Sequence, residues 1–347
     1  MGAIPMAPAS GAFDCLRLAA AFSVLFGHCY ALTGEGEPLA QLSQGRLGFG
    51  DTAVYTFFAI SGYLVTQSWH RDPSFNRFLS RRVLRIVPAL IFVIVASFAI
   101  VGPLTTTLGE WDYFSRSEAW SYLTKIFIYP VQYALPGAFA NNPFPNVVNG
   151  SLWTLRLEFG LYVMTAILGW LSILRCRLVN IGLALICLMM IVVLTQTELL
   201  NRIPFLHQTT VLFENALPFF AGAALAQRKF DLRLIRATIV LALLTVLLIF
   251  TPAFKSLFLL TLPLVVIVIA RCSTCDLSRF GDYSYGLYLW AFPVQQSVVH
   301  FAPNITPIRL FLLAGTVAFV CAVVSWHLVE KHALALKPRA FRAKETL

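Results

Sequence analysis

Three ionisable side chains, Asp14, Arg17 and His28, lie within or at the edge of one apolar run near the start of the chain, residues 13–33. As a helix this run would cover about 31 Å, close to the bilayer hydrocarbon thickness of about 30 Å. At about 100° per residue, all three side chains fall on one stripe of that helix. Because such groups are costly in lipid, the stripe is predicted to face protein or water. His28 could then act as a general base, with the charged pair marking a polar path towards it.

A carboxylate is predicted at the same depth as His28. If a helix begins at Leu152, Glu158 lies about 9 Å inside it and about 21 Å from the inner membrane boundary, and counting from Phe13 places His28 about 22 Å from that boundary. A carboxylate can orient an imidazole and favour its protonated form. The alternative is a structural ion pair, with Arg156 as the nearest partner in sequence; an ionisable residue inside the membrane favours the site.

The stretch 70–85 is strongly basic and contains Arg81, Arg82 and Arg85. One interpretation is topological, because short cytoplasmic loops collect Lys and Arg. The other is an anion site for a phosphorylated donor, because arginine supplies planar, bidentate hydrogen-bond donors to phosphate. The spacing of these arginines favours the second interpretation slightly.

The composition of the whole chain is that of a polytopic membrane protein. Of its 347 residues, 58% are hydrophobic and 12% are charged, which excludes an ordinary soluble domain. We therefore predict an all-α protein with a single transmembrane domain over 1–347 and about ten transmembrane helices. The ten apolar segments are 13–33, 52–69, 85–102, 152–173, 178–195, 210–226, 237–252, 256–270, 284–302 and 308–329. The apolar but proline-interrupted stretch 120–135 is interpreted as interfacial or re-entrant.

The distribution of Lys and Arg predicts the orientation. Of the 26 basic residues, 19 fall on the side that carries the N-terminus and 6 on the other side, and the more basic side is normally cytoplasmic. With ten spans, both termini are then cytoplasmic. The net charge of +10 is explained by this bias and by attraction to anionic membrane lipids, so no nucleic-acid partner is expected.

Other polar features carry weaker predictions. Ser61-Gly62, in the second segment, is interpreted mainly as a close helix contact and only secondarily as a ligand contact. Glu214 is either a second polar group of the cavity or the structural partner of an arginine. His207 and His300 are interpreted as ordinary interfacial histidines.

The seven cysteines are scattered along the chain. Cys15, like the others within spans, is interpreted as a small hydrophobic residue. Cys272-Ser-Thr-Cys275 has no histidine or second cysteine pair near it in sequence, so neither a zinc site nor a redox site is predicted there. No metal is expected.

Five motifs in order give the chain a family resemblance. They are Asp14-x-x-Arg17 followed by His28, FFAISGYL at 57–64, SRRVLRIVP at 80–88, NGSLWTLRLE at 149–158 and SYGLYL at 284–289. In these motifs the chain resembles, across nearly its full length, the acyltransferase-3 family of bacterial integral-membrane acyltransferases. The resemblance implies ten spans with both termini inside, in the bacterial inner membrane.

The resemblance also implies an activity and residue roles. It implies acyl transfer, most often of acetyl, from cytoplasmic acetyl-CoA (acyl-CoA) to a sugar hydroxyl of a cell-surface or exported polysaccharide or lipid-linked glycan. His28 then corresponds to the catalytic histidine, Arg17 to its partner, and Glu158 to the acidic residue after SLWTL. Arg81, Arg82 and Arg85 correspond to the donor-associated basic segment. The chain departs from many members at Ala291, where they carry a histidine.

Three alternatives stay open. Transfer could be direct, or His28 could be acylated transiently. Polar stripes in apolar helices also occur in transporters, although no inverted repeat is evident. The third alternative is a non-catalytic component of a polysaccharide-export complex. The acceptor, the acyl chain and the oligomeric state are not predicted by the sequence.

Overall fold

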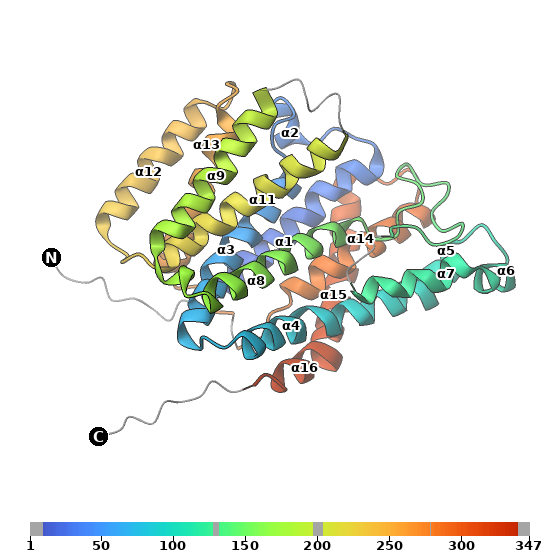
Figure 1. The fold of residues 1–347 in the computed structure, drawn as a ribbon. Helices are drawn as coiled ribbons and strands as arrows, with labels where there is room; N and C mark the ends of the chain where they lie inside the picture. The colour runs from blue at the N-terminus through green and yellow to red at the C-terminus, as the bar shows by residue number, and fades with distance from the viewer. Residues whose placement is uncertain (1–9, 128–131, 197–203, 278, 339–347) are drawn as a thin grey trace.

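Long helices account for most of the structure, a computed structural model that describes residues 10–127, 132–196, 204–277 and 279–338. Within these ranges ten helices have 16 or more residues (Figure 1). They are α1 (Ser10–Thr33), α3 (Phe49–Arg71), α4 (Phe75–Ala96), α8 (Trp153–Trp170), α9 (Arg177–Gln196), α11 (Pro204–Ala226), α12 (Leu232–Leu247), α13 (Phe254–Cys272), α14 (Ser284–Phe301) and α15 (Pro307–Ser325). Each coincides with one of the predicted apolar segments, so the all-helical prediction is confirmed.

Seven segments are long and apolar enough to cross a membrane, by length and composition alone, among the residues that the structure describes. They lie on α1, α4, α8, α9, α11, α13 and α15. The other three long helices are α3, α12 and α14. Helix α12 has only 16 residues, and α14 is made less apolar by residues such as Gln295 and Gln296. The chain is therefore a multi-helix membrane protein, while ten crossings and the orientation of the termini stay predictions.

Short helices complete the described chain. They are α2 (Pro38–Leu42), α5 (Gly102–Thr105), α6 (Glu110–Ser115), α7 (Ser117–Ser121) and α16 (Lys331–Ala335), with 3₁₀ turns at Tyr122–Phe127, Gly150–Leu152 and Ile173–Arg175. The stretch interpreted as interfacial or re-entrant, 120–135, contains the end of α7 and a 3₁₀ turn; its residues 128–131 lie outside the described residues.

The helix predicted to begin at residue 85 starts ten residues earlier, at Phe75. It continues through a π-helical turn at Ser97–Val101 and α5, so that 75–105 forms one helical segment. The early start places Arg81, Arg82 and Arg85 on a helix rather than in a loop. The physical reason is local neutralisation, because Arg81 pairs with Asp72 and Arg85 with Asp282.

The centre of the bundle is formed by α1 and α3, which pack against each other (Figure 1). Helix α1 also packs on α14 and α15, and α3 packs on α11. The last contact is very close: a Cβ atom at Gly62 would lie 1.9 Å from the carbonyl oxygen of Phe219. Only glycine fits there, as expected for small residues between apolar helices, so the packing interpretation of Gly62 is confirmed. Its neighbour Ser61 has a different environment, described below.

Candidate active site

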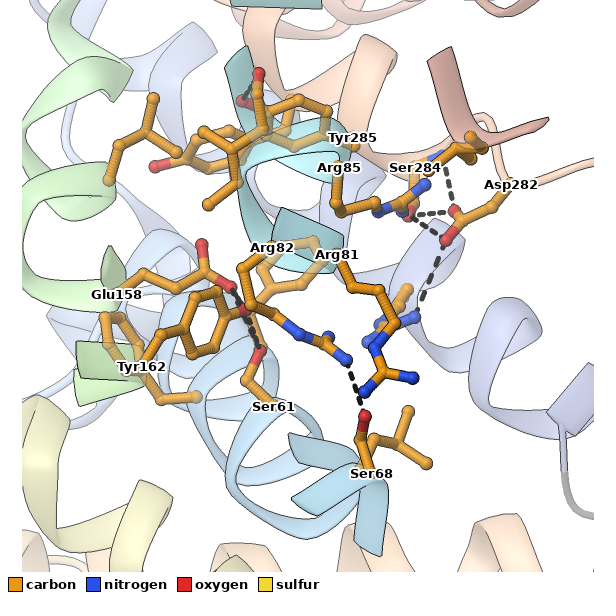
Figure 2. Close-up of a pocket in the computed structure, with 18 of the residues that line it drawn as sticks. Ser61, Ser68, Arg81, Arg82, Arg85, Glu158, Tyr162, Asp282, Ser284 and Tyr285 are labelled. Atoms are coloured by element: carbon orange, nitrogen blue, oxygen red, sulfur yellow. Dashed lines mark hydrogen bonds and ion pairs between the residues drawn. The ribbon is translucent and has the colours of Figure 1, made fainter. Parts of the chain in front are cut away.

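A cavity of about 560 Å³ lies between α1, α3, α4, α8 and α14 (Figure 2). This volume falls within the range of about 300–1,000 Å³ typical of small-molecule and cofactor sites. The wall combines six basic side chains with aromatic rings, hydroxyl groups and one intramembrane carboxylate. Its charged and hydroxyl-bearing members are Arg17, Arg71, Arg81, Arg82, Arg85, Lys337, Asp72, Asp282, Ser61, Ser68, Thr154, Glu158, Tyr162, Ser284, Tyr285 and Tyr288.

Asp282 joins two of the arginines predicted from the sequence. Its carboxylate pairs with Arg85 and lies 3.5 Å from Arg17 Nη1, and the hydroxyl of Ser284 donates to it (Figure 2). Burial would raise the pKa of Asp282, but the guanidinium groups of Arg85 and Arg17 outweigh burial and hold that pKa below its ordinary value. Asp282 therefore stays ionised and fixes both arginines in place. The sequence carried no signal for this residue, which lies 197 positions from Arg85.

A second acidic residue, Asp72, holds Arg81. The Arg81 Nη2 to Asp72 Oδ2 distance is 2.7 Å, and Arg77 binds the same carboxylate from the solvent side. Hydrogen bonds from Arg77 and then from Arg81 lower the pKa of Asp72. Arg82 donates to Ser68 Oγ at 3.1 Å, and its guanidinium lies 5.7 Å from the centre of the Tyr162 ring. The three predicted arginines are thus brought together on the cavity wall with Arg17.

Glu158 also lies on the wall, but its partners differ from those predicted. Its Oε1 atom accepts hydrogen bonds from Tyr162 and, at 3.0 Å, from Ser61 Oγ (Figure 2). Arg156 is exposed, and no ion pair joins it to Glu158 in the described structure. Ser61 therefore lies at the cavity. This position agrees with the secondary interpretation of Ser61-Gly62, a contact with a ligand. Tyr162 was not predicted, although its spacing of four residues from Glu158 places both on one face of a helix.

His28 is not among the residues that line the cavity. Its imidazole packs edge-on against Phe292, with 5.1 Å between ring centres, and its Nδ1 atom is buried without a hydrogen-bond partner. Within the described residues no hydrogen bond joins His28 to Glu158. The ring thus faces protein, as predicted for the polar stripe of α1, but the predicted contact with the carboxylate is not formed in this structure.

Asp14 is not among the described wall residues either. It lies 3.8 Å from Arg17 Nη1, one turn away on α1. Arg17 is thus placed between two carboxylates, Asp14 on its own helix and Asp282 on the loop before α14. Of the predicted site residues, the structure brings together Arg17, Arg81, Arg82, Arg85 and Glu158 on the cavity wall, while Asp14 lies beside Arg17 and His28 is off the wall.

Lys337 adds a basic group that sequence reasoning missed. It follows α16, and part of its side chain is exposed while the rest contributes to the cavity wall beside Leu334. Burial at the wall, and then repulsion from Arg85 and Arg82, lower the pKa of Lys337 to about 8. The only sequence signal was the basic character of the tail.

Glu214 is a structural residue away from this cavity. Its carboxylate pairs with Lys255 and accepts a hydrogen bond of 3.0 Å from Tyr55. Of the two interpretations, the structural partner is therefore confirmed, with lysine rather than arginine. His300 packs against Phe139 and Phe301, and the side chain of His207 lies outside the described residues.

The cysteine prediction was wrong for Cys15 and Cys275, which form a disulfide across 260 residues of sequence. The fold places the first turns of α1 beside the loop that follows α13, and no local spacing could reveal this proximity. Disulfides persist in oxidising compartments, so the side of the membrane on which the pair lies sets its state in the cell. Among the described residues, no group of three or more histidine, cysteine or acidic side chains could hold a metal ion.

Comparisons with known proteins bear on what this cavity does. The family model described as an acyltransferase domain matches residues 10–327. An O-acetyl transferase of Shigella phage Sf6 is 32% identical over 345 residues, covering 94% of this chain and 96% of the relative. Nodulation protein 10 of Rhizobium leguminosarum bv. viciae is 36% identical over 160 residues, covering 44% of this chain and 42% of that relative. No solved structure matches significantly.

Proposed function

Since this chain belongs to the acyltransferase-3 family, we propose that it is a membrane O-acyltransferase that moves an acetyl group from acetyl-CoA to a hydroxyl of a surface or exported glycan. The observation that supports this proposal is the cavity, which combines a basic group of side chains with an intramembrane carboxylate. Arginines suit the phosphates of CoA because each presents a planar fork of donors. The proposed site is the bacterial inner membrane, with the donor entering from the cytoplasm.

The proposed reaction uses the cavity in order. The phosphates bind at Arg81, Arg82 and Lys337, and the pantetheine arm extends along α8 past Glu158 towards Thr154. His28 then accepts the proton of the acceptor hydroxyl while the hydroxyl oxygen bonds to the acyl carbon. The carbon–sulfur bond breaks, and the proton passes to the leaving thiolate, which yields an ester and free CoA. Glu158, held by Tyr162 and Ser61, is proposed to stabilise the positive charge that develops on the imidazole.

The direct test is CoA release by purified protein in lipid nanodiscs, with labelled acetyl-CoA and extracted surface glycans. We expect acceptor-dependent release of free CoA together with label on the glycan. A transporter would move a solute without releasing CoA. A non-catalytic component would bind the glycan and leave the label on the donor, and either result would refute the proposal.

Changing Arg81 and Arg82 to lysine tests the donor site. We expect the double variant to bind acetyl-CoA about tenfold more weakly, because each charge-assisted, two-pronged hydrogen bond contributes about 1.5–3 kcal/mol and lysine replaces it only in part. Isothermal titration with acetyl-CoA measures the change. Arg77→Lys is the matched control, since Arg77 binds the same Asp72 but is not on the cavity wall. If all variants bound acetyl-CoA with equal affinity, Arg81 and Arg82 would not bind the donor, and their charge would be explained by membrane topology.

Lys337 should make donor binding depend on pH. Its pKa is lowered to about 8, and a bound phosphate favours the protonated form, so affinity should be highest below pH 8 and fall as the pH rises through 8 towards 9. Lys337→Met should weaken binding about fivefold at pH 7, as expected for a partly exposed ion pair. The same variant should bind with a flat pH profile over this range. A wild-type profile that is itself flat would exclude a contact between Lys337 and the donor.

A further inference from the structure

His28 is not on the cavity wall, but its ring contacts Phe292 on α14, one helical turn from the wall residue Tyr288. The cavity wall includes Thr154 and Tyr288, which hydrogen-bond each other at 2.6 Å. Phe292 lies one helical turn after Tyr288, and its ring meets His28 edge-on at 5.1 Å. Helix α14 therefore presents one residue to the cavity and the next residue on that face to the imidazole.

Phe292 also fills the space beside the turn that leads into α8. A Cβ atom at Gly150 would lie 2.7 Å from Phe292 Cε2, so the ring edge rests on bare backbone. The next residue, Ser151, accepts a hydrogen bond of 2.8 Å from Tyr288. The ring of Phe292 thus contacts both His28 and the Gly150–Ser151 turn, to which the wall residue Tyr288 is hydrogen-bonded.

On its other side Phe292 meets the loop before α8. Its ring centre is 6.1 Å from that of Phe144. Phe144 is 41% exposed whereas Phe292 is 5% exposed, so only one aromatic layer separates the ring from the surface. This loop is fastened to α14 by Gln296, which donates to the carbonyl oxygens of Phe144 and Val147 at 2.8 and 2.7 Å. The covering layer is therefore held in place one helical turn from Phe292.

We propose that Phe292 decides which nucleophile reaches the thioester: it excludes water while the donor is bound and yields when an acceptor hydroxyl enters beside His28. This inference rests on the proposed acyl transfer. Water reaching the thioester would add its oxygen to the acyl carbon, break the carbon–sulfur bond and leave acetate and free CoA, its proton passing to the thiolate. Exclusion of water is one established use of closing groups over an active site.

The test is the release of CoA from acetyl-CoA with no glycan present. Phe292→Ala should raise this uncoupled release at least about tenfold over wild type, because an opened site admits water. It should also lower the ratio of acylated glycan to CoA released. Phe292→Leu should give a smaller increase. Phe311→Ala is the matched control, since Phe311 also packs on α1, against Phe22 and Phe26, without touching His28.

A double variant makes the inference specific. If water enters beside His28, adding His28→Ala to Phe292→Ala should return uncoupled release to the background rate. A leak that survives the loss of His28, or no leak in either Phe292 variant, would overturn the role of Phe292. Because wild-type coupled transfer is measured in the same assay, those results leave the proposed function standing. Wild-type protein that never acylates a glycan would instead refute the proposed function itself.

Discussion

Replacing His28 by alanine is expected to lower acyl transfer by about 10²–10⁴-fold, the contribution of a well-placed general base. The protein should remain folded, because Nδ1 of His28 has no hydrogen-bond partner to lose and the ring contributes one aromatic contact, to Phe292. The measurements are CoA release with glycan present and the thermal unfolding midpoint of the protein in detergent.

The matched control is His300→Ala on α14, which removes an imidazole that packs against Phe139 and Phe301. His300 is remote from the cavity wall as described, so this variant should transfer acetyl at close to the wild-type rate. Donor binding should be unchanged in both variants. If His28→Ala acylated the glycan at the wild-type rate, the chemistry would have to be assigned to groups of the cavity itself, with Glu158 and Ser61 as the first to examine.

The helices were predictable because each apolar run is bounded by polar or proline-containing segments. All ten predicted runs overlap a long helix, including the three that are not among the most apolar. The error at α4 has a simple cause: a hydropathy count ends a helix where arginines begin. Arg81 and Arg85 continue the helix because Asp72 and Asp282 neutralise them, and the second partner is nearly 200 residues away.

Residue counting predicts a common depth for His28 and Glu158, which stays a prediction, and it could not predict the direction in which each side chain points. Counting residues along two helices gave His28 and Glu158 the same height in the membrane, yet a count says nothing of which way neighbouring helices turn their faces. Glu158 turns to Ser61 and Tyr162 on α3 and α8, while His28 turns to Phe292 on α14. Phe292 could not be singled out from the sequence, because a phenylalanine in an apolar helix does not differ in type from its neighbours.

The same reasoning explains why the disulfide and Lys337 were missed. Cys15 and Cys275 are joined by the way α1 and α13 pack, and Lys337 reaches the cavity only because α16 turns the chain back towards α4. Long-range proximity of this kind depends on helix packing rather than on local spacing. The motifs pointed to five residues that line the cavity, Arg17, Arg81, Arg82, Arg85 and Glu158, and missed Asp72, Asp282 and Lys337 on the same wall.

Glu158→Gln is expected to reduce acyl transfer about 100-fold, since the charge that steadies the imidazolium is lost while the side chain keeps its shape. The amide can still accept hydrogen bonds from Tyr162 and Ser61, so the free energy of unfolding should change little. Donor affinity should also be close to wild type, because the phosphates are bound by the basic residues. Steady-state CoA release, acetyl-CoA titration and thermal unfolding together measure these three quantities.

Glu214→Gln is the matched control, because it makes the same chemical change in a carboxylate outside the cavity. Glu214 is nearly buried and pairs with Lys255, which is 31% exposed. Removing its charge should cost about 1–3 kcal/mol of stability after allowing for that exposure, with activity per folded molecule retained. The two variants should therefore fail in opposite ways, Glu158→Gln in rate and Glu214→Gln in stability. If Glu158→Gln instead lost stability and kept its rate, Glu158 would be a structural residue. The positive charge on the His28 imidazolium would then need another source of stabilisation, since no carboxylate contacts His28 in the described chain.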